Sequence, residues 1–68
     1  MMKTLNTGTT ISCERENAET VEVWIRFPGT KAHECPDLYG IYKRGELRLD
    51  ADVTPSFRRQ IVAVAKAA

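Results

Sequence analysis

The chain of 68 residues is 43% hydrophobic and 28% charged, as is ordinary for a soluble globular domain, and has a formal net charge of +1 at pH 7. This length makes one small domain, residues 1–68, and is too short to enclose a deep catalytic cleft. The near-neutral charge gives no general attraction to nucleic acid or membranes. No run of about 18 apolar residues predicts a membrane-spanning helix. We therefore expect no membrane partner.

The N-terminal segment and the cysteines predict where the protein resides. No apolar core follows Lys3, so residues 1–6 do not read as a signal peptide. Without an export signal, we expect a cytoplasmic protein in which Cys13 and Cys35 are reduced thiols. Residues 1–6 carry little pattern, which predicts a disordered end or an edge strand.

Two strands are predicted next along the chain. Ile11 and Cys13 alternate with polar residues, which predicts a first strand near 9–14. A polar connection then leads to residues 20–27, which show the clearest period-two alternation in the chain. We expect these two strands to pair as an antiparallel hairpin.

The strand at 20–27 places the only tryptophan of the chain on its polar face. Its apolar side chains share one side, whereas Glu22, Trp24 and Arg26 share the other. An exposed aromatic side chain flanked by charges is typical of a binding hot spot. Two other interpretations stay open. Trp24 packs only on the stems of its charged neighbours, or a bulge turns it into the core.

A second hairpin and a helix complete the predicted fold. Residues 28–37 are the longest irregular stretch, and strands follow near 39–43 and 46–50, joined by a three-residue loop that ends at Gly45. Thr54 is a good N-cap, Pro55 is a good first helical residue, and an apolar stripe runs from there to the last residue. The predicted class is α+β: a four-stranded antiparallel sheet of two hairpins with one C-terminal helix packed on one face.

The alternation divides the predicted sheet into a covered and an open face. We expect an inward set that packs against Phe57, Ile61 and Val64 of the helix: Ile11, Cys13, Val21, Val23, Ile25, Phe27, Tyr39, Ile41, Leu47 and Leu49. A helix of thirteen residues is roughly 20 Å long and covers one face only. The other face is expected to stay open and to carry Thr10, Ser12, Glu22, Trp24, Arg26, Tyr42, Glu46 and Arg48.

Acidic residues before the helix have a structural explanation. Arg58 and Arg59 lie in the first turns of the predicted helix, where the helix dipole disfavours cations. Asp50 and Asp52 are near enough in sequence to neutralise them, and we expect that pairing. If it is absent, the two arginines are better explained as partner contacts.

Metal binding and catalysis have weak support. Cys13, His33 and Cys35 are candidate zinc ligands, with Glu34 or Asp37 as a fourth, but the paired C-x-x-C knuckles of zinc ribbons are missing. No glycine-rich phosphate loop, H-E-x-x-H or G-x-S-x-G motif is present either. We expect no catalytic residue, no cofactor and no enzyme activity.

These observations favour a non-enzymatic protein–protein interaction module that acts as a small regulator, inhibitor or adaptor. We expect it to dock through its open sheet face, with loop 28–37 or the exposed edge of the helix as alternatives and a homodimer as one form of the docking. Genes of this size are common in bacteriophages and mobile elements that redirect host machinery, and that expectation rests on size alone. We predict the following partner-binding residues: Glu22, Trp24, Arg26, Tyr42, Arg48, Arg58 and Arg59. The alternative is a small nucleic-acid-binding protein that uses its basic residues and sheet aromatics.

Overall fold

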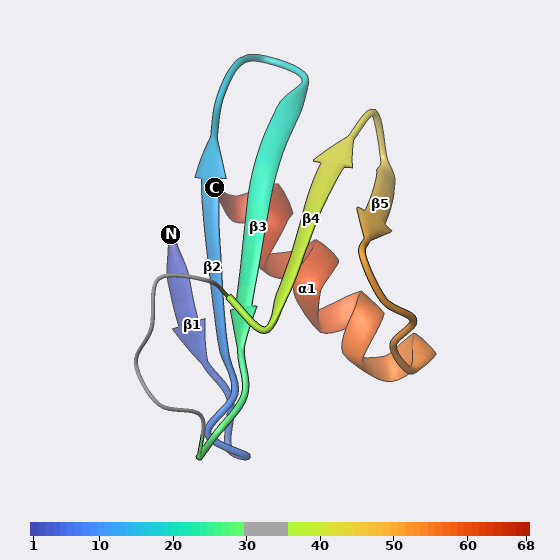
Figure 1. The fold of residues 1–68 in the computed structure, drawn as a ribbon. Coiled ribbons are helices and arrows are strands. Elements are labelled where there is room, and N and C mark those ends of the chain that lie inside the picture. The colour runs from blue at the N-terminus through green and yellow to red at the C-terminus, as the bar shows by residue number, and fades with distance from the viewer. Residues whose placement is uncertain (30–35) are drawn as a thin grey trace.

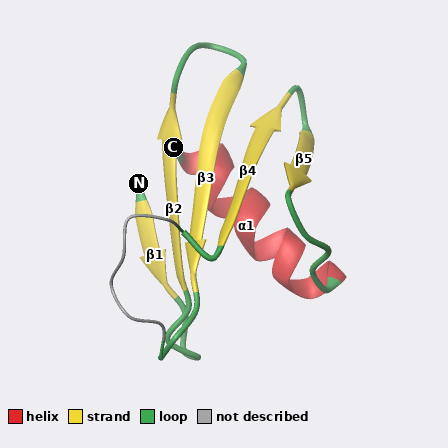
Figure 2. Ribbon diagram, viewed as in Figure 1, coloured by secondary structure: helices red, strands yellow, loops and turns green. Residues whose placement is uncertain are grey.

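In the computed structural model, which describes residues 1–29 and 36–68, an antiparallel sheet lies in front of a single helix (Figure 1). The five strands lie side by side in sequence order: β1 (Met2–Thr4), β2 (Thr10–Arg15), β3 (Thr20–Arg26), β4 (Leu38–Lys43) and β5 (Glu46–Leu49). The helix α1 (Pro55–Ala67) crosses one face of the sheet (Figure 2). The α+β class with a C-terminal helix is confirmed, and the sheet has five strands rather than four.

The additional strand is the N-terminal edge strand β1. Met2 lies opposite Ser12, and the amino group of Met1 donates a hydrogen bond of 2.6 Å to the carbonyl oxygen of Cys13. All three residues of β1 are exposed, so no hydrophobic alternation marks it in the sequence. Of the two expectations for residues 1–6, the edge strand is therefore the correct one.

The core lies between α1 and the covered face of the sheet. Its fully buried side chains come mostly from β2 and β3, where the expected alternation is confirmed. The buried apolar residues are Ile11, Cys13, Val21, Val23, Ile25, Leu38, Leu47, Ile61, Val64 and Ala65. Within the described ranges, α1 is the only helix, and it is too short to cross a membrane.

Strand β4 presents the opposite faces from those predicted. Tyr42 lies across from Val21 and packs against the core, whereas Tyr39 and Ile41 are exposed on the open face. The inward placement of Tyr39 and Ile41 and the outward placement of Tyr42 were therefore wrong. Gly40 has no side chain that could mark either face, so the alternation in β4 fits both parities, and the register with β3 decides between them by burying Leu38.

Two smaller expectations also differ. Phe27 follows the end of β3 and is exposed rather than buried, with its ring 6.5 Å from the ring of Phe57 between centroids. The turn between β4 and β5 has two residues rather than three, Arg44 and Gly45, which both adopt positive φ of 51° and 79°. A two-residue hairpin turn of this handedness matches the twist of the strands it joins.

The N-cap of α1 is formed as predicted. The hydroxyl oxygen of Thr54 accepts a hydrogen bond of 3.2 Å from the backbone N–H of Phe57, and Pro55 occupies the first turn. Replacing Thr54 by alanine removes this acceptor, so we expect Thr54→Ala to lower the free energy of unfolding by about 1 kcal/mol. Urea denaturation followed by circular dichroism measures the change. Thr54→Ser keeps the hydroxyl and is the control, and an equal loss in both variants would contradict the cap as the cause.

Candidate functional site

The open face carries a row of side chains that runs across four strands. The strand register places Met2 beside Ser12, Ser12 beside Trp24, and Trp24 beside Tyr39. In Figure 1 this face is turned to the viewer and α1 lies behind it, so among residues 1–29 and 36–68 no second layer covers the row. The parity predicted for Trp24 is confirmed, and the alternative that places it in the core is wrong.

Trp24 and Tyr39 form an aromatic pair at the β3–β4 end of the row. Their ring centroids are 6.0 Å apart and their planes are tilted by 53°, which is a favourable geometry for aromatic rings. Tyr39 is 37% exposed, the neighbouring Ile41 is 36% exposed and Met2 is 69% exposed. Trp24 is half-buried, and the Tyr39 ring lies against the indole. Apolar surface therefore remains available to water next to an indole that is already held in place.

A hydrogen bond fixes the tyrosine of this pair. The Tyr39 hydroxyl donates to the Glu22 Oε2 oxygen at 2.9 Å. This bond to a carboxylate, with desolvation and the negative charge of Glu22, raises the pKa of the Tyr39 hydroxyl. The neighbouring Glu22 carboxylate, as a hydrogen-bond acceptor for the protonated form and as a negative charge, raises the pKa of the Glu16 carboxyl. Glu22 thus lies between the aromatic pair and the acidic end of the β2–β3 hairpin.

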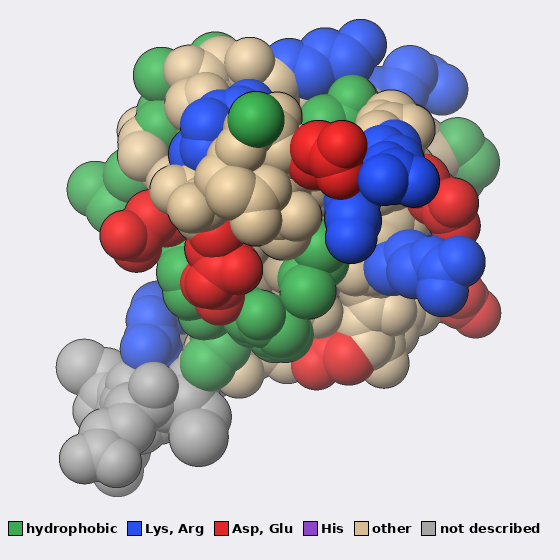
Figure 3. All heavy atoms as spheres, turned by 90° about the horizontal axis from the view of Figure 1, so that it is seen from above, with side chains coloured by type: hydrophobic (Ala, Val, Ile, Leu, Met, Phe, Trp, Pro, Cys, Tyr) green, Lys and Arg blue, Asp and Glu red, His purple; other side chains and the backbone are tan. Residues whose placement is uncertain are grey.

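Charges of both signs surround the aromatic pair. Glu22 and Arg26 lie two residues before and after Trp24 on the same face of β3. On β5, Arg48 pairs with Glu46 at 3.0 Å, and both side chains are largely exposed. Figure 3, seen from the end of the sheet that carries the two hairpin turns, shows acidic and basic side chains next to one another. Acidic and basic side chains therefore alternate around the aromatic pair.

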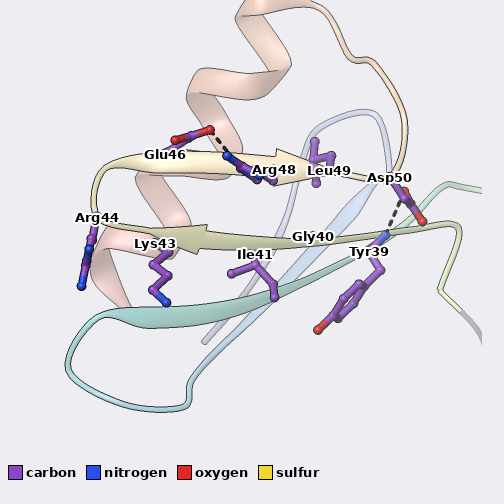
Figure 4. A pocket seen from close by; sticks show the side chains of 9 residues that line it. All are labelled: Tyr39, Gly40, Ile41, Lys43, Arg44, Glu46, Arg48, Leu49 and Asp50. Atoms are coloured by element: carbon purple, nitrogen blue, oxygen red, sulfur yellow. Dashed lines mark hydrogen bonds and ion pairs between the residues drawn. The ribbon is translucent and has the colours of Figure 1, made fainter.

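The open face is hollowed along the β4–β5 hairpin. A shallow depression of about 540 Å³ is lined by both strands, and Figure 4 shows Tyr39, Ile41 and Lys43 on one side of β4. Asp50 accepts a hydrogen bond of 3.2 Å from the backbone N–H of Tyr39, which holds the end of the depression. The depression continues the apolar surface of the aromatic pair towards the edge of the sheet.

The predicted partner-binding residues are therefore not all on one surface. Four of them, Glu22, Trp24, Arg26 and Arg48, belong to the open face. Tyr42 packs on the helix side, and Arg58 and Arg59 are on α1, in the other layer. The site residues missed from the sequence are Tyr39, Ile41 and Met2. Aromatic cross-strand pairs are favourable, but the sequence does not show which of Tyr39 and Tyr42 shares the face of Trp24, so it carries no signal that selects Tyr39.

The expected pairing of acidic residues with Arg58 and Arg59 is not formed. Among the described residues, no ion pair joins Asp50 or Asp52 to either arginine. Asp50 accepts a hydrogen bond from the backbone N–H of Tyr39, and Arg58 donates a hydrogen bond to the backbone carbonyl of Leu47. The prediction was wrong because closeness in sequence does not show that the Asp50 carboxylate is hydrogen-bonded to the backbone of β4.

The candidate metal ligands are not assembled in the described part of the chain. Cys13 is a buried free thiol, and burial raises its pKa. The Oδ2 oxygen of Asp37 accepts a hydrogen bond of 2.7 Å from the backbone N–H of Phe27. His33, Glu34 and Cys35 lie outside the described residues. Within residues 1–29 and 36–68, no three side chains of the metal-ligating types come together.

The chain was compared with models of protein families, with curated proteins and with solved structures. None of the three comparisons found a match.

Proposed function

We propose that this protein is a non-enzymatic interaction module that docks its open sheet face on a protein surface. The observation that carries the proposal is the Trp24–Tyr39 pair, with exposed Ile41 beside it, on a face that α1 does not cover. Large aromatic side chains bury much area and lose little conformational entropy on binding, so they anchor protein interfaces.

The charges around the pair define the chemistry of the partner. Glu22 and Arg26 flank Trp24, so the complementary surface has an apolar centre with a base on one side and an acid on the other. A module of this kind acts by occupying its partner's surface, as a small regulator, inhibitor or adaptor does. The rim charges would set orientation, and the aromatic centre would supply most of the affinity.

One observation favours nucleic acid as a second candidate partner. Helix α1 carries Arg58, Arg59 and Lys66 and no acidic residue, and its exposed side lies away from the open face. Binding through these side chains would weaken steeply with added salt, because phosphate contacts release counterions. Docking centred on Trp24 would depend on salt only weakly.

Site-specific photo-cross-linking tests the proposed docking. A photoreactive phenylalanine analogue replaces Tyr39 on the open face or, as the matched control, Arg59 on α1, and cells producing each protein are irradiated. We expect a protein adduct from position 39 and none from position 59. Trp24→Ala is expected to reduce the adduct by at least about thirty-fold, since a central aromatic anchor contributes about 2 kcal/mol or more.

Three controls decide the interpretation. Circular dichroism melting must show that Trp24→Ala keeps its fold. Phe27→Ala removes an exposed aromatic ring outside the open face and should leave the adduct intact. A nucleic-acid adduct, a protein adduct confined to position 59, or a protein adduct insensitive to Trp24→Ala would each reject the proposal.

A further inference from the structure

The open face is complementary to itself. We infer that its partner is a second copy of this chain, packed face to face so that the two β3 strands run antiparallel across a two-fold axis at Trp24. This inference rests on the proposed function, because it names the protein that the open face docks on.

The order of charges along β3 is the first support. Glu22, Trp24 and Arg26 share one face of the strand, in the order acid, aromatic, base. A two-fold axis perpendicular to the strand at Trp24 reverses this order in the second copy. Each Glu22 then faces an Arg26 of the other copy, and this happens twice in the dimer. In a two-fold interface a contact made once is always made twice, so this arrangement is self-complementary.

Both charged groups can make the additional contact. Glu22 already accepts a hydrogen bond from Tyr39, and a carboxylate has about four lone-pair sites in all. A guanidinium has five N–H donors in a planar fork, so Arg26 can serve a carboxylate of the second copy as well as the group it already contacts. The intermolecular ion pairs are therefore compatible with the Tyr39–Glu22 hydrogen bond.

The position of Trp24 in the sheet is the second support. Strand β3 is the central one of five, with two strands on each side, so an axis at Trp24 passes through the middle of the face. Two sheets related in this way would pack about 10 Å apart with their strands within about 30° of each other, as paired sheets normally do. Beside the indole, the register places the small Ser12, which leaves room for the other copy's ring.

The size of the face is the third support. Five strands about 4.8 Å apart, with lengths of three to seven residues at about 3.3 Å per residue, give a face of roughly 400 Å² in projection. A stable interface buries about 800 Å² of accessible surface per partner, which is about a sixth of the 4684 Å² of this chain. Side chains protrude from the face, so its accessible area is larger than its projected area and is of the same order as the area that a stable interface buries.

Sedimentation equilibrium of the full chain over a wide concentration range tests the dimer. We expect the wild-type protein to dimerise and Trp24→Ala, which removes two rings per dimer, to weaken dimerisation by on the order of a thousand-fold. Glu22→Arg and Arg26→Glu each place like charges opposite one another twice and should weaken it by at least about ten-fold. The double variant Glu22→Arg/Arg26→Glu exchanges the two charges, so opposite charges again face each other across the axis. It should recover most of the affinity.

The double variant separates contacts between copies from contacts within one copy. It does not restore the Tyr39–Glu22 hydrogen bond, so its recovery reports on the ion pairs across the interface. Arg59→Glu makes the same change of charge on α1 and should dimerise like the wild type. If a charge-reversed variant fails to melt cooperatively, Glu22→Gln and Arg26→Gln replace it, and each should give a smaller loss.

Several outcomes would overturn this arrangement. A monomeric wild-type protein at every concentration would exclude the second copy as the partner. If a Tyr39 cross-link to another protein persisted in that case, the interaction module would stand and only its partner would change. A dimer in which the double variant is no better than the two single variants, or in which Arg59→Glu weakens association equally, would exclude the antiparallel arrangement at Trp24.

Discussion

Replacing Ile61 by alanine is expected to lower the free energy of unfolding by about 2–5 kcal/mol. Ile61 is 0% exposed and lies on the buried side of α1 with Val64 and Ala65, which face the covered side of the sheet. Truncation removes three methyl or methylene groups from water-excluded contacts and leaves a cavity that the surrounding strands can fill only in part. Small domains have unfolding free energies of about 5 kcal/mol, so a loss at the upper end of this range would unfold about half of the variant at room temperature.

Denaturant titrations followed by circular dichroism measure this loss. Val62→Ala is the matched control, because Val62 neighbours Ile61 in the same helix and is only partly buried. We expect the control to lose less than half as much stability. Similar denaturation midpoints for Ile61→Ala and the wild type would show that the buried side of α1 does not support the fold.

Gly40→Ala is expected to destabilise the protein by about 1–3 kcal/mol through steric overlap. A Cβ atom at position 40 would lie 2.5 Å from the backbone oxygen of Arg48 and 2.5 Å from the Cδ2 atom of Leu49. The side chain of Leu49 can rotate away, but the Arg48 oxygen belongs to the neighbouring strand and moves only if β4 and β5 separate. The expected loss therefore includes part of the pairing between these two strands.

Gly45→Ala distinguishes this overlap from a general cost of replacing glycine. Gly45 adopts a positive φ of 79°, and a Cβ there would meet no atom within 4 Å. We expect a loss of about 1 kcal/mol from backbone strain alone. The measurement is again the denaturation midpoint. If Gly40→Ala were no more harmful than Gly45→Ala, the close approach of the β4 and β5 backbones would have no energetic consequence.

The parts of the fold that could be predicted are those in which several local signals agree. In β3, alternation over seven residues marks both faces. At α1, the cap by Thr54 marks where the helix begins, and the apolar stripe marks its buried side. In β4, the six-residue pattern contains Gly40 and an aromatic residue on each face, so local alternation fits either parity. Only pairing with β3, a contact between distant residues, determines which side faces α1.

The candidate site shows the same division. The exposure of Trp24 follows from its parity with Glu22 and Arg26, which is a local property of one strand. Its pairing with Tyr39 depends on the register between β3 and β4, and residues 28–37 between them give no sign of it. Residues of one strand could therefore be assigned to the site, whereas the aromatic neighbour that completes it could not.

The two edge strands have a consequence for solubility. Exposed edges offer unpaired backbone groups to other chains and are the usual starting points of amyloid-like growth. Here β1 has three residues and includes Lys3, and β5 has four and carries Glu46 and Arg48. Arg58 of α1 also donates to the carbonyl of Leu47 in β5, so a helix side chain occupies an acceptor on that edge strand. Short, charged and partly occupied edges disfavour indefinite growth of the sheet from edge to edge.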